Sequence, residues 1–238
     1  MPVVTQLETT YEYLRDLIAR GVVAPGKKLS RRRLAEEVGV SPALVQQALG
    51  QLENEGLVER RPQSGTYVRE LTLDEYANLC DLRELIEPYA AARAASRITD
   101  RQLASLQKSC QRFRRLGERS QQAEDAAKNW RIVGKLVQEE QVFHGTILNA
   151  AQNPLLVNVI SNLRLLAQVR SNRSETATQR HLKIADEHEG ILLALQARDA
   201  DLAHTRMLEH IRGSRGALTR MSATSETASG ETSIEPSH

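Results

Sequence analysis

The sequence predicts a mainly α-helical protein in two parts, a small N-terminal domain of helices with one β-hairpin and an all-helical bundle after it. Two observations lead to this fold class. Every plausible strand signal falls between residues 5 and 69, whereas residues 72–221 have apolar side chains at the helical period almost throughout. The 238 residues are also enough for two compact domains. We therefore divide the chain into a first domain, a helical bundle and a polar, disordered tail, over residues 1–70, 71–220 and 221–238.

Three helices open the first domain. The first covers about residues 5–20, and the second follows Ser30 and ends at Gly39. The third has Ser41 as its N-cap and Pro42 at its first helical position, where the missing backbone N–H costs nothing and φ is already suitable. Pro42 is therefore expected to start this helix and not to break it.

A hairpin follows the third helix, which is expected to stop at Gly56. Apolar and polar residues alternate at period two over residues 57–60 and 66–69, on either side of the turn residues 62–65. Two short helices joined by a tight turn and followed by such a hairpin make a winged helix-turn-helix. In this fold the first turn of the second short helix can enter the major groove of DNA.

Six helices account for the second domain. Thr72, with Glu75 three residues on, has the pattern of a capping box and opens a helix to about residue 97, and Thr99 with Gln102 opens the next. The remaining helices are expected over residues 123–151, 154–172, 175–197 and 200–219.

Composition excludes several classes of function. The aromatic residues are one Trp, five Tyr and two Phe, too few for a platform that stacks unpaired bases. The formal net charge is +2, so any nucleic-acid surface must be a local patch. Cys80 and Cys110 have neither the number nor the spacing of a disulfide framework or a metal site. No stretch is typical of a secretion signal or a membrane span, so we expect a cytoplasmic protein.

Positive charge gathers beside the predicted helix-turn-helix. A run of charge is by itself usually a solvated face, but next to a helix-turn-helix and a wing it favours double-stranded DNA as the partner. The charged residues are Lys27, Lys28, Arg31, Arg32 and Arg33 before and within the second helix, and Arg60 and Arg61 at the wing.

The stretch LSRRRLAEEVGVSPALVQQALGQLENEGLVERRPQSGTYV, with its lead-in APGKKL, resembles the winged-helix domain of the GntR family of bacterial transcription regulators. The resemblance covers residues 6–68. It implies DNA contacts at Arg32 in the second helix, Ser41 at the cap of the third and Gly65 in the wing. Together with their neighbours, the residues expected to bind DNA are Arg31, Arg32, Arg33, Ser41, Pro42, Ala43, Gln46, Gln47, Ser64 and Gly65.

Two positions depart from the family pattern. Members commonly carry an Arg after the capping residue and a second Arg one turn later, where this chain has Pro42 and Gln46. An Arg can hold guanine O6 and N7 with two bonds, whereas a Gln suits adenine N6 and N7. We therefore expect an operator unlike those of Arg-bearing relatives, with phosphate attraction shifted onto Arg31 and Arg33.

Four residues of the bundle have the character of metal ligands. Glu140 and His144 are four residues apart and so on the same side of one helix, and His188 and His210 each lie among apolar residues at helical spacing. One carboxylate and three neutral imidazoles from three helices suit Zn, Ni or Mn. A single inward histidine is more often a hydrogen-bonded core residue, so no pair among the four is diagnostic by itself.

Three stretches of the bundle resemble the FCD effector domain attached to many GntR regulators. They are DLRELIEPYAAARAA, EEQVFHGTILNAAQNPLL and EHEGILLALQARDADLAHTRMLEHI, and the resemblance covers residues 73–215. In metal-containing members the ligands are an Asp four residues before a Phe-His, that His, and one His in each of the last two helices. The resemblance therefore implies a divalent metal ion held by Glu140, His144, His188 and His210, with Glu in place of the family's Asp.

The same resemblance implies an effector. FCD domains bind small organic acids, often with a carboxylate of the acid completing the coordination of the metal. Arg83 matches a recurrent family Arg and is a candidate partner for that carboxylate, although a surface Arg is nearly as good an interpretation. Asn158 and Arg164 are further candidates for the lining of the same cavity. His181 and His204 fall outside the pattern and are expected to be surface or structural residues.

These features predict a dimeric, ligand-responsive transcription regulator that represses a metabolic operon. As a homodimer it would read two half-sites of a near-palindromic operator. Two rival functions stay open: a metal-dependent enzyme, and a helical interaction protein that has lost DNA reading through Pro42 and Gln46. The enzyme requires a further acid, base or nucleophile near the metal, and Glu139, Glu187 and Glu189 are expected to point away from it.

Overall fold

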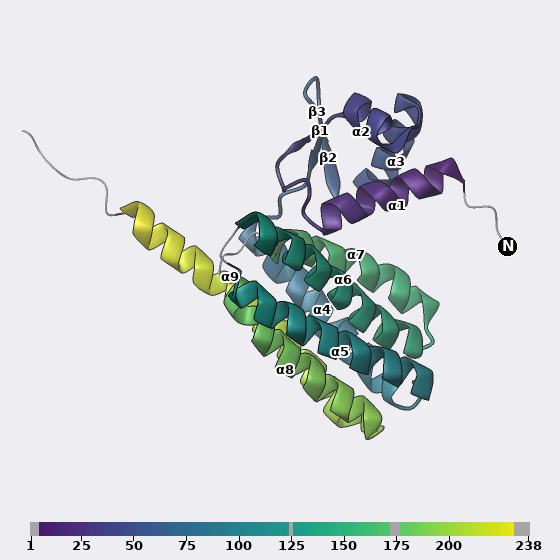
Figure 1. Cartoon of the computed structure of the whole chain (residues 1–238), viewed down its shortest axis with the longest axis vertical. Helices are drawn as coiled ribbons and strands as arrows, with labels where there is room; N and C mark the ends of the chain where they lie inside the picture. Colours follow the sequence, from purple (N-terminus) through teal and green to yellow (C-terminus); the bar gives the residue numbers. More distant parts are fainter. Residues whose placement is uncertain (1–4, 124–125, 172–176, 231–238) are drawn as a thin grey trace, which may run out of the picture.

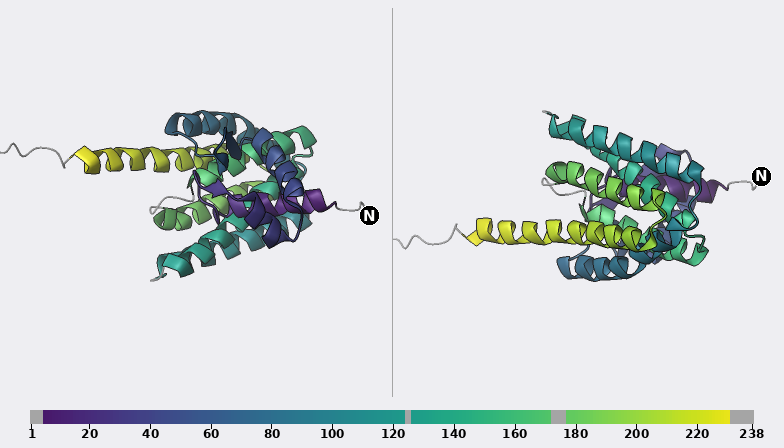
Figure 2. Two further views of the ribbon diagram at one scale, coloured as in Figure 1. Left: turned by 90° about the horizontal axis from the view of Figure 1, so that it is seen from above. Right: turned by 90° about the horizontal axis from the view of Figure 1, so that it is seen from below.

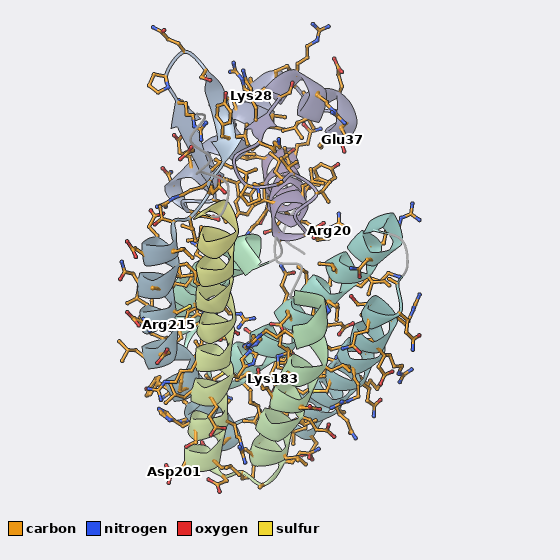
Figure 3. The ribbon with its side chains drawn as sticks, turned by 90° about the vertical axis from the view of Figure 1, so that its left-hand side faces the viewer. Arg20, Lys28, Glu37, Lys183, Asp201 and Arg215 are labelled. Carbon is orange, nitrogen blue, oxygen red and sulfur yellow. The ribbon has the colours of Figure 1, made fainter. Side chains whose placement is uncertain are left out.

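A winged helix-turn-helix stands on one end of a helical bundle in the computed structural model of the chain (Figure 1). The structure describes residues 5–123, 126–171 and 177–230. Within these ranges the predicted fold class is confirmed. Lys28 and Glu37 lie at the end remote from the bundle, and Arg20 lies at the junction between the two parts (Figure 3).

Hydroxyl caps fix where the helices of the first domain begin. The side chains of Thr5, Ser30 and Ser41 each accept a hydrogen bond from the backbone N–H three residues on. Pro42 starts its helix as predicted, and Gly39 ends the preceding one in the left-handed region with φ +76°. The elements are α1 (Gln6–Ala19), β1 (Lys28–Leu29), α2 (Arg31–Val38), α3 (Pro42–Asn54), β2 (Val58–Arg61) and β3 (Gly65–Val68).

The three short strands form an antiparallel sheet in the order β1-β3-β2. The strands of the hairpin differ by one residue from those that the alternation indicated, because Arg61 pairs with Gly65. Strand β1, where Lys28 pairs with Tyr67, was not predicted. A strand of two residues is too short to show a period, so only the fold reveals that this lysine lies beside the wing.

The core of the winged helix is formed by the inward faces of its helices. Val45, Leu49 and Leu52 of α3 are buried with Leu14 of α1 in one cluster. Leu165 of α7 is buried in the same cluster, although it belongs to the bundle. The two domains therefore share a hydrophobic contact, and the first turn of α3 lies outside it.

Capping boxes open the first two bundle helices as predicted, with reciprocal bonds between Thr72 and Glu75 and between Thr99 and Gln102. Seen from above and below, the bundle helices lie side by side, and the end of α9 projects beyond them (Figure 2). The bundle consists of α4 (Leu73–Ala95), α5 (Asp100–Gln121), α6 (Ala126–Ala150), α7 (Pro154–Ser171), α8 (Ala177–Gln196) and α9 (Ala200–Gly230).

The last helix corrects one expectation. It was expected to end near residue 219 and to be followed by a disordered tail from residue 221, but α9 continues to Gly230. Between Gly216 and Gly230 the sequence has neither glycine nor proline. A helix that is already nucleated can therefore propagate through this polar stretch, gaining one hydrogen bond for each residue that it fixes. The rest of the predicted tail, residues 231–238, lies outside the described residues.

Several polar side chains are buried inside the bundle. Phe113, Phe143, Ile147 and Ile191 are almost completely shielded from water, as expected for a helical core. Four imidazoles, one carboxylate and one guanidinium are buried in the described part of the same bundle: His144, His181, His188, His210, Glu87 and Arg83. Buried groups of this kind need partners, so they mark a site.

Candidate functional site

Helix α3 lies in the domain that stands on one end of the bundle (Figure 1), and the residues at its start are exposed. Ser41, Pro42, Ala43 and Gln47 are exposed, and Gln46 is half-buried. The hydroxyl of Ser41 accepts from the backbone N–H of the third helical residue at 3.2 Å, which fixes this turn. The predicted reading residues of α3 are therefore brought together on one accessible face.

The arginines of α2 are exposed beside this face. Arg32 forms an ion pair with Glu36 at 3.2 Å, and its side chain is 90% exposed. Arg31 reaches across to α3, where its NH1 donates to Gln46 Oε1 at 2.9 Å. Arg33 is exposed on the same helix. All three cations thus remain accessible to phosphates or bases.

The wing is held in shape by short polar contacts. The hydroxyls of Ser64 and Tyr67 lie 2.6 Å apart, and the guanidinium of Arg61 stacks 4.2 Å over the ring of Tyr67. Gly65 has φ +125°, and a Cβ there would meet Lys28 Cε at 2.9 Å. The predicted contact Gly65 therefore has a conformational reason to be glycine.

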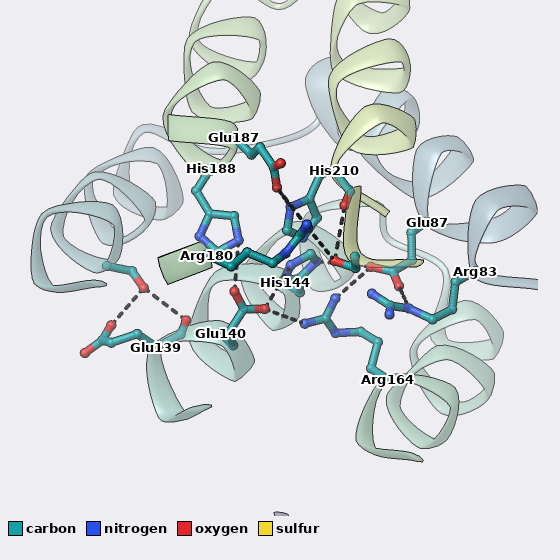
Figure 4. Close-up of polar contacts among 12 residues, drawn as sticks. Arg83, Glu87, Glu139, Glu140, His144, Arg164, Arg180, Glu187, His188 and His210 are labelled. Carbon is teal, nitrogen blue, oxygen red and sulfur yellow. Dashed lines mark hydrogen bonds and ion pairs between the residues drawn. The ribbon is translucent and has the colours of Figure 1, made fainter. Parts of the chain in front are cut away.

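In the bundle, four helix positions from three helices converge on one point (Figure 4). Glu140 and His144 lie one turn apart on α6, His188 comes from α8 and His210 from α9. One ligand atom from each lies within 4.8 Å of the others. Four ligand atoms at about 2.1 Å from one metal ion in tetrahedral geometry lie roughly 3.4 Å from one another, so the most widely separated pair would close by at most about 1.4 Å.

The cluster contains polar atoms without hydrogen bonds. Glu140 Oε1 lies 3.2 Å from His188 Nε2, and Glu140 Oε2 lies 3.5 Å from His144 Nε2. These approaches lack hydrogen-bond geometry, so both ring nitrogens of His144 and of His188 and Oε1 of Glu140 are buried without such a bond. Unpaired lone pairs that converge in a buried place fit a cation.

Burial prepares these side chains for metal binding. Desolvation lowers the pKa of His188, and it lowers the pKa of His210 to about 4. Both imidazoles are therefore neutral near pH 7 and keep a lone pair free. Burial raises the pKa of Glu140, but the neighbouring imidazoles of His188 and His144 outweigh it and hold this pKa well below its ordinary value. The set therefore contains one carboxylate and, at His188 and His210, two neutral imidazoles.

Two further carboxylates orient the rings. Nδ1 of His210 bonds to Glu187 Oε2 at 2.8 Å, and Nδ1 of His144 lies 3.1 Å from Glu87 Oε2. Each contact leaves Nε2 of the ring for the centre of the cluster. The expectation that Glu187 points away is wrong: it lies next to His188 on α8, at the border with α9, and so reaches His210.

The other two acids of that expectation do point away. Glu139 accepts from Arg112 Nε at 2.6 Å, and Glu189 pairs with Arg114 at 2.9 Å. Both partners belong to α5. No additional acid or base from this pair reaches the cluster.

The three predicted effector residues have different surroundings. Arg83 is not a surface residue, because its side chain is only 7% exposed and its Nε lies 2.6 Å from Glu87 Oε1. Arg164 NH1 contacts Glu87 at 2.7 Å and its NH2 lies 3.5 Å from Glu140. Asn158 is exposed on α7, and the structure does not bring it to the cluster. Sequence reasoning identified Arg164 but missed Glu87, which joins both arginines to His144.

The signal that could have identified Glu87 is its place in the sequence. It follows Arg83 by four residues on a helix face that also carries Ala90, Ala91 and Ala94, all buried. Burial raises the pKa of Glu87, yet the guanidiniums of Arg83 and Arg164 hold that pKa well below its ordinary value. A charged pair on an otherwise apolar face indicates a buried ion pair.

The two histidines outside the ligand set behave differently from each other. His181 is buried with its ring edge-on to Phe113, at 6.3 Å between centroids, and burial lowers its pKa to about 4. His204 is exposed on α9. Neither belongs to the cluster, as the sequence predicted. None of the helices in the described ranges is both long and apolar enough to cross a membrane.

Comparisons with known proteins find a known family in each part of the chain. The model of the family described as bacterial regulatory proteins, gntR family, matches residues 6–68, and that of the FCD domain matches residues 78–213. The HTH-type transcriptional repressor RspR of Escherichia coli K12 is 29% identical over 218 residues, covering 89% of this chain and 91% of the relative. The HTH-type transcriptional regulator LutR of Bacillus subtilis is 30% identical, covering 82% of this chain and 93% of the relative.

The fold agrees with a solved structure as well. McbR/YncC of E. coli superposes with a TM-score of 0.80 over 92% of this chain and 99% of that one, at 19% sequence identity. The two matched families cover the winged helix and the bundle in the order in which they occur here. The chain therefore belongs to the GntR family of bacterial regulatory proteins, carries an FCD domain, and is a DNA-binding transcription regulator.

Proposed function

We propose that this regulator is a repressor that senses a small carboxylic acid through a metal ion held in its FCD domain, and that it acts in the cytoplasm as a homodimer on a near-palindromic operator. The observation that carries the proposal is the buried cluster of Glu140, His144, His188 and His210, in which Oε1 of Glu140 and both ring nitrogens of His144 and His188 have no hydrogen bond. A relative named as a repressor supports the sign of regulation.

The metal would be a divalent ion such as Zn, Ni or Mn. Glu140 would supply one carboxylate oxygen, and His144, His188 and His210 would each supply Nε2. When bound, the ion offers positive charge and open coordination to an acid. Glu187 and Glu87 keep two of the rings turned toward it.

Charge in the cluster explains why an acid would need the metal. Arg83 and Arg164 contribute two positive charges, Glu87 and Glu140 contribute two negative ones, and the buried imidazoles of His188 and His210 are neutral. The protein groups alone nearly cancel, so they attract a carboxylate only weakly. A divalent ion makes the site positive, and the guanidinium of Arg164, which lies 3.5 Å from Glu140, can then pair with the acid. Arg83 would support Arg164 through Glu87.

Helix α7 offers a route from the acid to the DNA. Arg164 lies in the cluster, and the next residue, Leu165, is buried in the core of the winged helix. An acid that draws Arg164 away from Glu140 would shift α7 and bias how the winged helix sits on the bundle. Such coupling is commonly about 1 to 3 kcal/mol, enough to weaken operator binding about five- to a hundredfold.

An exposed apolar face supports the homodimer. Leu82, Leu85 and Tyr89 of α4 are 48%, 73% and 49% exposed, and Leu155 and Val159 of α7 are 76% and 51% exposed. The two helices pack against each other through Ile86 and Leu156, among others. Exposed apolar side chains on two helices that pack together favour a partner, and a second copy would also present a second reading helix.

On DNA, the first turn of α3 would enter the major groove, with α2 and the wing on flanking phosphates or the minor groove. Two copies related by a two-fold axis would read half-sites about one helical turn, or a multiple of it, apart. The residues proposed to contact DNA are Arg31, Arg32, Arg33, Ser41, Pro42, Ala43, Gln46, Gln47, Ser64 and Gly65.

Elemental analysis tests the metal. Protein prepared without chelator should hold about one equivalent of divalent metal per chain, and His144→Ala less than a few tenths. His204→Ala is the matched control, because His204 is exposed on the same helix as His210 but outside the cluster. Metal that persists in His144→Ala would contradict the site.

Footprinting on the DNA upstream of its own and neighbouring genes tests the regulator. We expect protection of a near-palindrome, and its loss when the metal-loaded protein is given an acid found by a thermal-shift screen of carboxylic acids. No protection at low salt would contradict DNA reading, whereas equal binding of the acid by His144→Ala would contradict only a metal-bound acid.

A further inference from the structure

A hydrogen bond between α2 and α3 changes what the reading helix can offer to a base. NH1 of Arg31 donates to Oε1 of Gln46 at 2.9 Å. Arg31 is the first residue of α2 and is exposed, and Gln46 lies one turn into α3 and is half-buried. The guanidinium of Arg31 is therefore held beside the reading helix, although the residue belongs to the supporting one.

The bond occupies one of the two lone pairs of Gln46 Oε1 and so reduces its capacity to accept from a base. A free glutamine offers one acceptor and one donor, which is the pattern that complements adenine N6 and N7. With Oε1 held by Arg31, Gln46 offers the N–H groups of Nε2. Arg31 has further guanidinium N–H groups besides the one that it spends on Gln46. The pair thus presents several donors against the single lone pair of Gln46 Oε1 that Arg31 leaves unused.

We propose that Arg31 and Gln46 form one composite reader that selects guanine in the major groove. Guanine offers two acceptors there, N7 and O6, whereas adenine offers one acceptor and a donor that would face the donors of the pair. This inference rests on the proposed placement of α3 in the groove. It replaces the expectation from the sequence that Gln46 by itself reads adenine.

The competing role for Arg31 is a plain phosphate contact. A phosphate contact contributes affinity that is equal for all sequences and depends on salt, and it carries no preference for a base. Arg33 is the matched control for this role. It lies on the same exposed helix, and within the described residues its side chain forms no hydrogen bond or ion pair with α3.

The test is selection of binding sites from a random pool of double-stranded DNA by the full-length protein. Wild type, Arg31→Ala, Arg33→Ala and Gln46→Ala are selected in parallel at low salt, where the loss of one cation is tolerated. The affinity of each protein is then measured for two forms of the selected consensus. One form has guanine and the other has adenine at the position where the variants differ.

The wild type should favour guanine over adenine by about five- to a hundredfold in each half-site. Arg31→Ala frees Oε1 of Gln46 and should move the preference at that position to adenine. Gln46→Ala should reduce the discrimination to less than about threefold, since it removes one donor and the anchor of Arg31. Arg33→Ala should weaken binding to both forms equally and leave the selected base unchanged.

Two results would overturn the inference: an unchanged consensus with Arg31→Ala, or full discrimination with Gln46→Ala. These results differ from a failure of the proposed function, in which the wild type would select no sequence from the pool. A site selected by all four proteins with one base preference would therefore contradict only the composite reader and assign Arg31 to the phosphates.

Discussion

Two ion pairs in this chain have the same composition and the same spacing but different surroundings. Arg32 and Glu36 in α2 are 90% and 68% exposed, whereas Arg83 and Glu87 in α4 are 7% and 2% exposed. The spacing of four residues brings each pair together. Burial decides how much the loss of one partner lowers the free energy of unfolding. Water stabilises the charges of the exposed pair, whereas only protein partners stabilise those of the buried pair.

The same difference separates the two functional regions. The DNA-reading surface is exposed and is built from residues close in the sequence, whose charges remain free to meet phosphates. The cluster in the bundle is buried and is built from distant helices. Its charged groups, among them Glu87, Glu140 and Arg164, depend on one another. Substitutions should therefore lower the free energy of unfolding only slightly at the DNA-reading surface and strongly in the buried cluster.

One substitution made in both pairs tests this difference most strongly. Glu87→Gln leaves the guanidiniums of Arg83 and Arg164 buried without a carboxylate between them, and we expect it to lower the free energy of unfolding by about 3 to 5 kcal/mol. Glu36→Gln in the exposed pair should cause no measurable change. Urea titrations at one protein concentration measure both variants. Similar effects at the two positions would break the comparison.

A second prediction concerns the contact between the regions. Leu165→Ala removes a side chain of α7 that is buried in the winged-helix core, and it should cost about 3 kcal/mol. Hydrogen exchange should show lost protection in α3 as well as in α7. Leu193→Ala, at a residue of α8 that is 58% exposed, is the control and should change little. Unaltered exchange in α3 would show that the two regions are less coupled than this packing indicates.

Metal removal should have a somewhat smaller effect. A metal at a hundred times its Kd stabilises the folded protein by about 2.7 kcal/mol, so dialysis against chelator should lower the free energy of unfolding of the wild type by about that amount. In His144→Ala the same treatment should have no effect, because a ligand is missing. In His204→Ala it should act as in the wild type. A chelator effect that survives in His144→Ala would place the metal elsewhere.

The local features of the fold could be predicted because each depends on neighbours in the sequence. Ser41 and Pro42 start α3 with one side-chain oxygen and one preset φ, and Thr72 needs only Glu75 three residues on. Within the ligand set, the pairing of Glu140 with His144 follows from their spacing on one helix side, whereas His188 and His210 were added by the resemblance to the FCD domain. These inferences need no knowledge of which helices meet.

The features that could not be predicted depend on how the helices pack. Whether Glu187 points to solvent or to His210 is decided by the angle between α8 and α9, and whether Glu87 is paired with Arg164 is decided by the position of α7. The bond from Arg31 to Gln46 likewise exists only because two helices cross. Periodicity predicts the inward face of a helix, but it does not predict which side chain lies opposite.

The smallest change in stability is expected at Ser41 in the exposed region. Different substitutions of this residue separate an effect on folding from an effect on DNA binding. Ser41→Ala removes the cap of α3 and should cost about 1 kcal/mol, whereas Ser41→Asp keeps a capping oxygen and should leave the free energy of unfolding unchanged. The new carboxylate would face phosphates, so Ser41→Asp should bind the selected operator much more weakly, and Ser41→Thr should resemble the wild type in both measurements. Thermal unfolding and gel shifts distinguish the three variants. Full operator binding by Ser41→Asp would mean that the first turn of α3 does not approach DNA. The small stability changes expected for substitutions at this exposed surface would then not be explained by a role in DNA reading.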